Sequence, residues 1–298
     1  MNYLKQNLLK ITRVITQMDW IPKGFRFRLA NNLFPPKPHN TYHFQVPFSN
    51  FTYNGDISNY IDWSVYFFGA YEKEDLMLCV KLLKGLNQKQ KEIYLYDVGA
   101  NIGHHALYLS SYAHKVFAFE PYPVVREKML AKIRSNHISN IEVVPYGLSD
   151  QAGKIPFTAP SVDNLGAGFF SHEVEPIAET ASTLSLEVIN GDEYILESQV
   201  DYPDFIKMDI EGFEPFALSG LQHTLQQARP ILMIELSARC AQHIQAMGKS
   251  SIFDFLPGQY QAFVRSGENL LSINEVLYNG ENYFFVPQES CKELKLEL

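Results

Sequence analysis

The segment "YLYDVGANIGHHALYL" at residues 94–109 constrains the fold of this 298-residue chain more than any other part. Tyr94 to Tyr96 form an apolar run typical of a strand, and an apolar pattern typical of a helix begins at Ala106. Gly99 and Gly103 lie between them. A strand, a glycine turn and a helix in this order place backbone N–H groups and a helix N-terminus beside a ligand. The segment therefore predicts a ligand-binding α/β fold.

Beyond residue 93, short apolar segments alternate with helical patterns. Strands are expected at 93–98, 115–120, 141–147, 204–210 and 231–236, and "ENYFFVP" can supply a late strand. Helices are expected at about 104–112, 124–136, 214–227 and 238–247. This alternation is typical of an open, mostly parallel sheet with helices on both faces. Residues 151–200 interrupt it and predict a β-rich insert.

The first 68 residues form a distinct N-terminal extension in the sequence. Apolar residues at helical spacing predict one or two basic helices, followed by aromatic-rich strands or a hairpin. Residues 1–40 hold seven Lys or Arg and one acid, Asp19. This segment therefore carries +6, which leaves −14 for the remainder of a chain whose net charge is −8. A basic amphipathic helix of this kind packs on the main domain, contacts a membrane surface or holds a partner.

Composition excludes several classes of protein. The negative net charge argues against a sequence-independent nucleic-acid binder. We see no apolar run of about 18 residues, which a membrane-spanning helix needs, and no secretory signal. Cys79, Cys240 and Cys291 are widely separated, so we expect free thiols in a reducing cytoplasm.

The glycine turn differs from the dinucleotide fingerprint G-x-G-x-x-G because its second glycine is missing. Asp97 precedes Gly99 by two residues, where it would repel a pyrophosphate but suit the ammonium of an amino-acid group. Glu120 ends the next strand and can accept hydrogen bonds from both ribose hydroxyls. The ligand indicated is nucleoside-like at one end and amino-acid-like at the other. The rival interpretation is a glycine turn with a solvated glutamate.

The segments "DVGANIG", "FAFEPYP", "GLSD" and "DFIKMDIEGFE", with "RPILMIEL" after them, resemble the FkbM family of class I S-adenosylmethionine-dependent methyltransferases. The resemblance implies a Rossmann-like fold with a seven-stranded sheet over residues 69–298. It implies S-adenosylmethionine as the cofactor. The residues implied in its binding are Asp97, Gly99, Ala100, Asn101 and Gly103 around the methionine part, Glu120 and Pro121 at the ribose, Ser149 and Asp150 near the adenine, Glu72 in the weaker match "GAYEKED", and Asp209 near the methyl group.

The reacting end is expected in "KMDIEGFE". Lys207, Asp209 and Glu211 would point one way along a strand of period two. Asp209 is our first candidate for the residue that faces the methyl group or the nucleophile, with Glu211 next. The alternative is a Lys–carboxylate ion pair that only fixes the strand end. Other candidate bases are His104 or His105 after the glycine turn and His172 in the insert.

A divalent metal held by Asp209 and Glu235 is a further alternative, but no dense acidic cluster follows, and we expect no metal site. The aromatic residues 44–71 could form an acceptor wall, although burial in the core is the better interpretation.

The resemblance implies an O-methyltransferase that acts on a hydroxyl of a small molecule, a secondary metabolite or a sugar, and we expect it in the cytoplasm. A nicotinamide-dependent oxidoreductase and a non-catalytic scaffold subunit are the alternatives. The sequence does not determine the oligomeric state, and a homodimer is one alternative.

Overall fold

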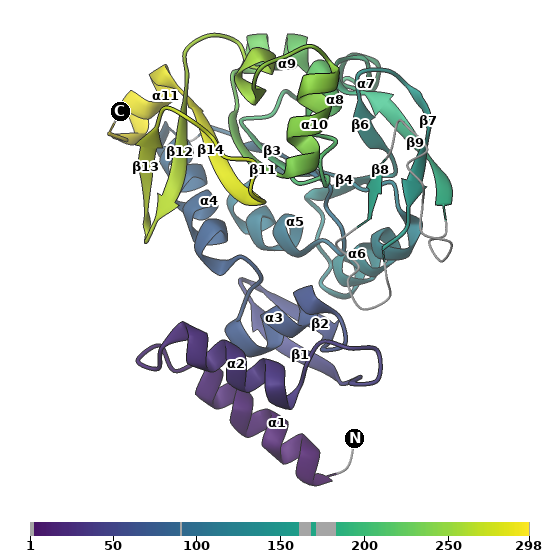
Figure 1. The fold of residues 1–298 in the computed structure, drawn as a ribbon, viewed down its shortest axis with the longest axis vertical. Coiled ribbons are helices and arrows are strands. Elements are labelled where there is room, and N and C mark those ends of the chain that lie inside the picture. Colours follow the sequence, from purple (N-terminus) through teal and green to yellow (C-terminus); the bar gives the residue numbers. More distant parts are fainter. Residues whose placement is uncertain (1–2, 90, 161–167, 171–182, 298) are drawn as a thin grey trace. The chain divides into compact units, whose positions relative to one another are not determined.

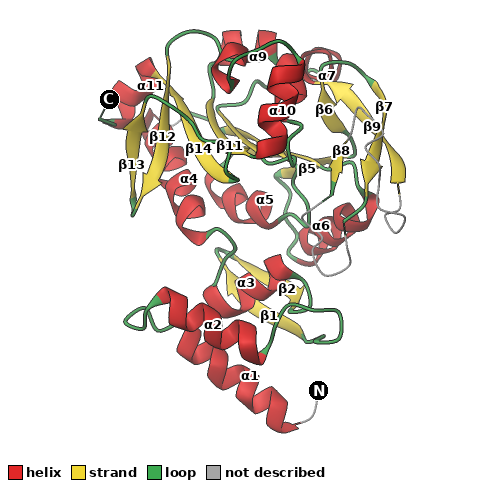
Figure 2. Ribbon diagram, viewed as in Figure 1, coloured by secondary structure: helices red, strands yellow, loops and turns green. Residues whose placement is uncertain are grey.

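The computed structural model describes residues 3–89, 91–160, 168–170 and 183–297, and it divides into two compact units. The first contains the described residues up to Lys73 together with Pro160, and the second contains the rest. The boundary between methyltransferase domain and extension at residues 68 and 69 stays a prediction. Figures 1 and 2 show the elements of both units.

The first unit packs three helices around a hairpin. Its elements are α1 (Tyr3–Thr16), α2 (Lys23–Leu33), β1 (His43–Phe48), β2 (Phe51–Asp56) and α3 (Tyr60–Phe68). The β1 and β2 strands pair antiparallel. The Asn59 side chain caps α3 by accepting hydrogen bonds from the first turn, and Gly69 ends the helix in a left-handed conformation. The predicted helical and hairpin extension is confirmed.

Most of the aromatic residues considered for an acceptor wall lie in the core of this unit. Trp63 and Phe67 are fully buried, and the Trp63 indole N–H donates to the backbone oxygen of Phe34 at 2.6 Å. Burial therefore accounts for most of these residues, as the core interpretation predicts.

The second unit is built on an eight-stranded sheet in the order β13-β12-β14-β11-β10-β3-β4-β5. The parallel strands are β3 (Tyr94–Val98), β4 (Lys115–Phe119), β5 (Ile141–Val144), β10 (Phe205–Met208) and β11 (Ile231–Leu236). The antiparallel strands are β12 (Tyr260–Ser266), β13 (Asn269–Ile273) and β14 (Glu281–Pro287). The central strands are buried on both faces, which explains their near-continuous apolar sequence.

The predicted number of seven strands is wrong by one. The late strand at 281–287 is confirmed, but the β12–β13 hairpin adds an edge that the sequence pattern did not reveal. The predicted strand 141–147 is also divided, into β5 and β6 (Gly147–Ser149). Pro145 lacks the N–H group that a continuing ladder needs, and β6 joins a different sheet.

The β-rich insert is confirmed as a four-stranded sheet in the order β6-β9-β7-β8. Its other strands are β7 (Gly153–Thr158), β8 (Phe169–Phe170) and β9 (Thr183–Asn190). A small apolar cluster that includes Phe157, Phe170 and Phe213 connects this sheet with the end of β10. His172 lies outside the described residues.

Helices cover both faces of the large sheet, as predicted (Figures 1 and 2). They are α4 (Lys73–Leu86), α5 (His104–Leu109), α6 (Pro123–Ser135), α7 (Gly191–Ser198), α8 (Glu214–Ser219), α9 (Gln222–Ala228), α10 (Ala238–Ala246) and α11 (Gln288–Leu294). The single helix expected at 214–227 is two helices that separate at Gly220. A side chain there would lie 1.9 Å from the backbone oxygen of Ser149, so only glycine fits.

Candidate functional site

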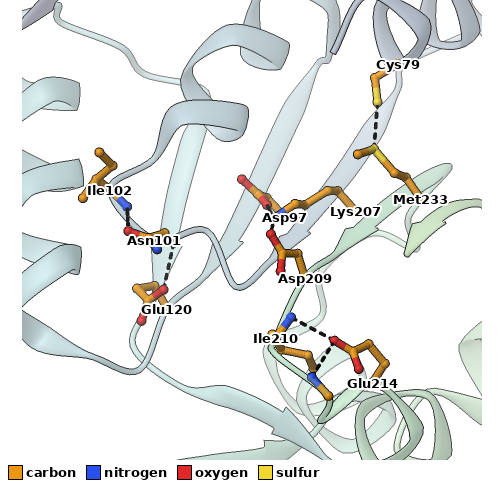
Figure 3. Close-up of polar contacts among 11 residues, drawn as sticks. Cys79, Asp97, Asn101, Ile102, Glu120, Lys207, Asp209, Ile210, Glu214 and Met233 are labelled. Atoms are coloured by element: carbon orange, nitrogen blue, oxygen red, sulfur yellow. Dashed lines mark hydrogen bonds and ion pairs between the residues drawn. The ribbon is translucent and has the colours of Figure 1, made fainter. Parts of the chain in front are cut away.

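The chain reverses its strand order between β3 and β10. From β3 it builds outward through β4 to β5, and it then returns to place β10 on the other side of β3. Ligands of open α/β sheets bind at the carboxyl ends of the strands at such a switch point. Asp97, Lys207 and Asp209 meet there (Figure 3).

The glycine turn after β3 is fixed against both neighbouring strands. The N–H groups of Gly99 and Ala100 donate to the backbone oxygen of Phe119 at 3.0 and 3.1 Å. Gly99 has φ +79, and a Cβ there would lie 2.1 Å from the backbone oxygen of Asp209. Asn101 also adopts a left-handed conformation, with φ 53. Because no side chain fits at Gly99, the turn holds the backbone close to the ligand position.

Asp97 is fully buried inside the sheet. Within the described part of the chain, neither of its carboxylate oxygens has a hydrogen-bond partner, and Lys207 Nζ lies 3.7 Å from Oδ1. Burial raises the pKa of Asp97, and the nearby Lys207 ammonium offsets part of that rise. An acid in this state is costly to bury unless a ligand completes its hydrogen bonds.

Glu120 follows β4 and is tied to the same turn. Its Oε2 accepts a hydrogen bond from the N–H of Asn101 at 2.8 Å (Figure 3). Its Oε1 accepts one from the N–H of Tyr122, also at 2.8 Å. Burial raises the pKa of Glu120 to about 7, although these N–H groups and Arg126 favour the charged form. The backbone oxygen of Pro121 accepts from Arg126 Nη1 at 2.7 Å.

The strand β10 ends at Met208, and this changes the geometry expected for "KMDIEGFE". Lys207 Nζ lies 3.3 Å from Asp209 Oδ2, so the ion pair of the alternative interpretation is present. Glu211 lies beyond the strand with φ 56, and the chain turns again at Gly212. The expectation that the period-two alternation extends to Glu211 is therefore wrong, because the strand ends two residues earlier than predicted.

The carboxyl groups around this turn titrate differently. Burial alone would raise the pKa of Asp209. The Lys207 ammonium and a hydrogen bond with Glu235 lower it by more, so the pKa lies below its usual range. Burial and the Asp209 charge raise the pKa of Glu211 to about 7. The site thus contains one ionised carboxylate next to one that titrates near neutral pH.

Glu214, the last residue of "KMDIEGFE", stabilises the local backbone. It is fully buried, and its Oε1 accepts hydrogen bonds from the N–H groups of Ile210 and Gly212 at 3.1 and 3.2 Å (Figure 3). This carboxylate fixes the turn that carries Glu211. Arg239 Nη1 fixes the same turn by donating to the backbone oxygen of Glu211 at 3.2 Å.

The two histidines after the glycine turn are buried in α5. Burial, with Lys132 and Lys207 nearby, lowers the pKa of His104 to about 3, and the pKa of His105 is also well below its usual value. Both rings are therefore neutral at physiological pH. A base with such a low pKa removes protons from hydroxyl groups poorly.

Ser149 and Asp150 lie at the end of β6. The Ser149 hydroxyl donates to Asp150 Oδ1 at 3.0 Å, and Asn190 Nδ2 donates to the backbone oxygen of Asp150 at 2.8 Å. Glu72 belongs to the first unit. Burial raises the pKa of Tyr60 there, and the charge of Glu72 adds to that rise. The roles of these three residues stay predictions.

Sequence reasoning missed Lys132, which is buried in α6 with its Nζ donating to the backbone oxygen of Ile102 at 3.3 Å. The signal was available, because Lys132 shares the helical face of Met129 and Val125. Among the described residues, no group of three or more His, Cys, Asp or Glu side chains could hold a metal ion.

Two cavities of the second unit lie away from these residues. One of about 490 Å³ is bordered by Ile93, Ala113 and His114, at the amino ends of β3 and β4. The other, of about 290 Å³, lies between α4 and the C-terminal residues from Glu293 to Leu296. The chemistry of the strand ends, rather than cavity size, identifies the candidate site.

A family model described as the methyltransferase FkbM domain matches residues 97–266, more than half of the chain. A relative, the hexuronic acid methyltransferase AglP of Haloferax volcanii, is 31% identical over 153 residues. That match covers 51% of this chain and 59% of the relative, so the chain spans less than two thirds of it.

Solved structures show weaker similarity. A methyltransferase FkbM from Methylobacillus flagellatus has 21% identity and a TM-score of 0.43, over 65% of this chain and 43% of that chain. A SAM-dependent methyltransferase from Agrobacterium tumefaciens has 8% identity and a TM-score of 0.43, over 82% of this chain and 69% of that chain.

Proposed function

The chain belongs to the FkbM methyltransferase family, and on that basis we propose that it transfers a methyl group from S-adenosylmethionine to a hydroxyl oxygen of a sugar. The observation that carries the proposal is the buried carboxylate of Asp97. Among residues 3–89, 91–160, 168–170 and 183–297, its two oxygens accept no hydrogen bond of ordinary length, Lys207 Nζ lies 3.7 Å away, and the acid lies at the switch point of the sheet.

The residues at the strand ends fit this cofactor. An ammonium group donates three hydrogen bonds, which would satisfy the buried Asp97 oxygens and offset their charge. Each oxygen of Glu120 accepts one backbone N–H, and an ionised carboxylate has about four acceptor sites, so capacity remains for ribose hydroxyls. The crowded position of Gly99 keeps side-chain atoms out of the same space.

The residues that would hold the cofactor follow from this fit. We assign Asp97, Gly99, Ala100, Asn101 and Gly103 to the methionine part, Glu120 and Pro121 to the ribose, and Ser149 and Asp150 to the adenine. The cofactor supplies an activated methyl group on a sulfonium, whose leaving group is neutral. Alignment of the acceptor oxygen and removal of its proton are left to the protein.

We assign proton removal to the carboxylates after β10. Asp209 is ionised and fixed by Lys207, so it can accept a hydrogen bond from the acceptor hydroxyl and orient it. Glu211 has a pKa of about 7, which is close to the optimum for a general base at neutral pH. Lys207 acts as a positioning residue, and the low pKa of His104 makes it the weaker candidate base.

Two observations support a sugar acceptor. The relative from Haloferax volcanii is a hexuronic acid methyltransferase. In this chain, carboxylates at the ends of β10 and β11 offer acceptors for several hydroxyl groups, and the Arg239 guanidinium lies 3.5 Å over the ring of Phe169. This cation would favour an acceptor that carries a carboxylate. The particular sugar is not part of the proposal.

We place the protein in the cytoplasm, which is supported by three buried cysteines that form no disulfide bond, Cys79, Cys240 and Cys291. Within the described ranges, no helix has the length and apolar character needed to cross a bilayer. A homodimer stays a prediction.

Isothermal titration calorimetry with S-adenosylhomocysteine tests the cofactor assignment. We expect binding, with the dissociation constant raised at least tenfold in Asp97→Asn, because about 1.5–3 kcal/mol is lost with a charged hydrogen bond. Glu197→Gln changes an exposed acid on α7 and should leave the affinity unchanged.

The same titration with NADH distinguishes the alternatives. Binding of NADH instead of S-adenosylhomocysteine would support an oxidoreductase. Full affinity in Asp97→Asn would contradict the site, and no binding of either ligand would support a scaffold subunit. After cofactor binding is established, transfer of labelled methyl to uronic acid glycosides and neutral glycosides tests the acceptor class.

A further inference from the structure

The helix α1 buries its more polar side and exposes its apolar side. Its buried residues are Leu9, Thr12 and Thr16, and the Thr16 hydroxyl donates to the backbone oxygen of Phe67 at 2.7 Å. Leu4, Leu8 and Ile11 occupy the i, i+4 and i+7 positions of a different stripe and are exposed. Packing inside the first unit therefore does not explain why this stripe is apolar.

The exposed apolar surface continues beyond α1. We call it the outer apolar surface, and it consists of Tyr3, Leu4, Leu8, Ile11, Val14, Trp20, Phe25 and Phe27. Trp20 lies between α1 and α2 and is 81% exposed. Large exposed apolar side chains concentrated on two helices that pack together are typical of an interaction site.

Basic residues flank this surface. Lys10, Lys23 and Arg28 are exposed on α1 and α2. Arg13 and Arg26 are engaged inside the unit, where they donate to the backbone oxygens of Tyr66 and Thr16, both at 2.9 Å. With +6 on residues 1–40 and −14 on the remainder, an anionic surface would attract this segment and repel the rest of the chain.

We propose that the outer apolar surface attaches the protein peripherally to an anionic phospholipid bilayer, with α1 and α2 lying in the plane of the interface. Leu, Ile, Trp and Phe side chains beside Lys and Arg are the composition of interfacial helices. Lysine is depleted in protein–protein interfaces, which makes a protein partner the less favoured occupant. This attachment does not depend on the methyl-transfer reaction.

Flotation of the full chain with lipid vesicles tests the proposal. We expect binding to vesicles of phosphatidylcholine mixed with phosphatidylglycerol, and weak binding to phosphatidylcholine alone. The double variant Leu4→Glu/Ile11→Glu should reduce binding at least about tenfold, and Lys10→Glu/Arg28→Glu by about tenfold. All four side chains are exposed, so the fold should persist, which circular dichroism can verify.

The matched control is Leu196→Glu on α7. Leu196 and Leu4 are both 78% exposed, but Leu196 lies outside the outer apolar surface. Its variant should bind vesicles as the unchanged protein does. Equal loss in this control, or no binding to anionic vesicles at all, would overturn the proposal. Sedimentation that shows a dimer without vesicle binding, and a monomer for Leu4→Glu/Ile11→Glu, would establish a protein interface instead.

Discussion

Two buried aspartates, one in each unit, show how a structural acid differs from one kept for a ligand. In the first unit, Asp62 Oδ1 accepts from the Tyr53 hydroxyl at 2.8 Å and Oδ2 accepts from the N–H of Asp56 at 3.0 Å. In the second unit, Asp97 is also buried, but its oxygens accept no hydrogen bond of ordinary length in the described ranges, and Lys207 Nζ lies 3.7 Å away. Hydrogen bonding, rather than burial, distinguishes the two acids.

Replacement of one glycine in each unit gives the largest expected change in stability. Gly69 and Gly99 both have positive φ, but a Cβ at Gly69 would meet no atom of the described chain within 4 Å. We expect Gly69→Ala to cost about 1 kcal/mol and Gly99→Ala about 4 kcal/mol, because the latter adds a clash with the backbone of Asp209 to the strained φ.

The two units offer separate probes for these variants. Both tryptophans, Trp20 and Trp63, lie in the first unit, so tryptophan fluorescence reports its unfolding and far-UV circular dichroism reports the whole chain. Gly99→Ala should lower the midpoint of the circular dichroism transition more than Gly69→Ala does. Equal losses of stability in the two variants would show that the backbone at Gly99 can move to accept a side chain, so that its close contact with Asp209 does not require glycine.

Removal of the structural acid should have the next largest effect. Asp62→Ala leaves the Tyr53 hydroxyl and the N–H of Asp56 without their acceptor, and we expect a loss of about 3 kcal/mol in the unfolding free energy. Urea denaturation followed by tryptophan fluorescence measures it. The control Asp19→Ala, whose side chain is 85% exposed, should change stability by less than about 0.5 kcal/mol. A comparable loss in both variants would remove the distinction between the two acids.

The pKa of Glu120 predicts how nucleoside binding depends on pH. The charged carboxylate accepts hydrogen bonds from ribose hydroxyls, and burial raises its pKa to about 7. Below that pH the free protein holds a proton there, so adenosine affinity should fall by up to about tenfold per pH unit and level off above it. Adenosine lacks the amino-acid group that Asp97 would bind, so Asp97 contributes little to this slope.

Calorimetry of adenosine binding at several pH values gives the measurement, and 2′,3′-dideoxyadenosine is the control. Without ribose hydroxyls it should bind weakly and without this pH dependence. Equal pH profiles for the two ligands would place the ribose away from Glu120.

Much of the fold could be predicted because its signals are local. The apolar strands and the spacing of Asp97, Gly99 and Gly103 identified the sheet and its ligand-binding edge. The β12–β13 hairpin was missed because its residues are half exposed and alternate weakly. The division of 141–147 depends on which sheet receives the residues after Pro145, and that is a long-range property.

The site could be predicted only as a group of residues. Lys207 and Asp209 were expected together, but the distance of Lys207 from Asp97 depends on the pairing of β3 with β10 across more than a hundred residues. The turn that removes Glu211 from the alternation depends on the buried Glu214 carboxylate, and the sequence alone does not distinguish Glu214 from the other acids of "KMDIEGFE".

The smallest expected effect is a gain in stability, from replacement of Asp97, and it distinguishes Asp97 from Asp62 most directly. Burial raises the pKa of Asp97 above its unfolded value, so stability is lost as the pH rises from the unfolded toward the folded pKa, and the loss is complete above the folded pKa. Asp97→Asn removes this charge, and Lys207 keeps Asp209 at 3.3 Å as its partner. We therefore expect the unfolding free energy of Asp97→Asn to exceed that of the unchanged protein by about 1 kcal/mol at about pH 8, and the gain to shrink as the pH falls toward about 4, the unfolded pKa of an aspartate. Urea denaturation followed by circular dichroism measures both values. A loss of stability at pH 8 would mean that Asp97, like Asp62, supports the fold.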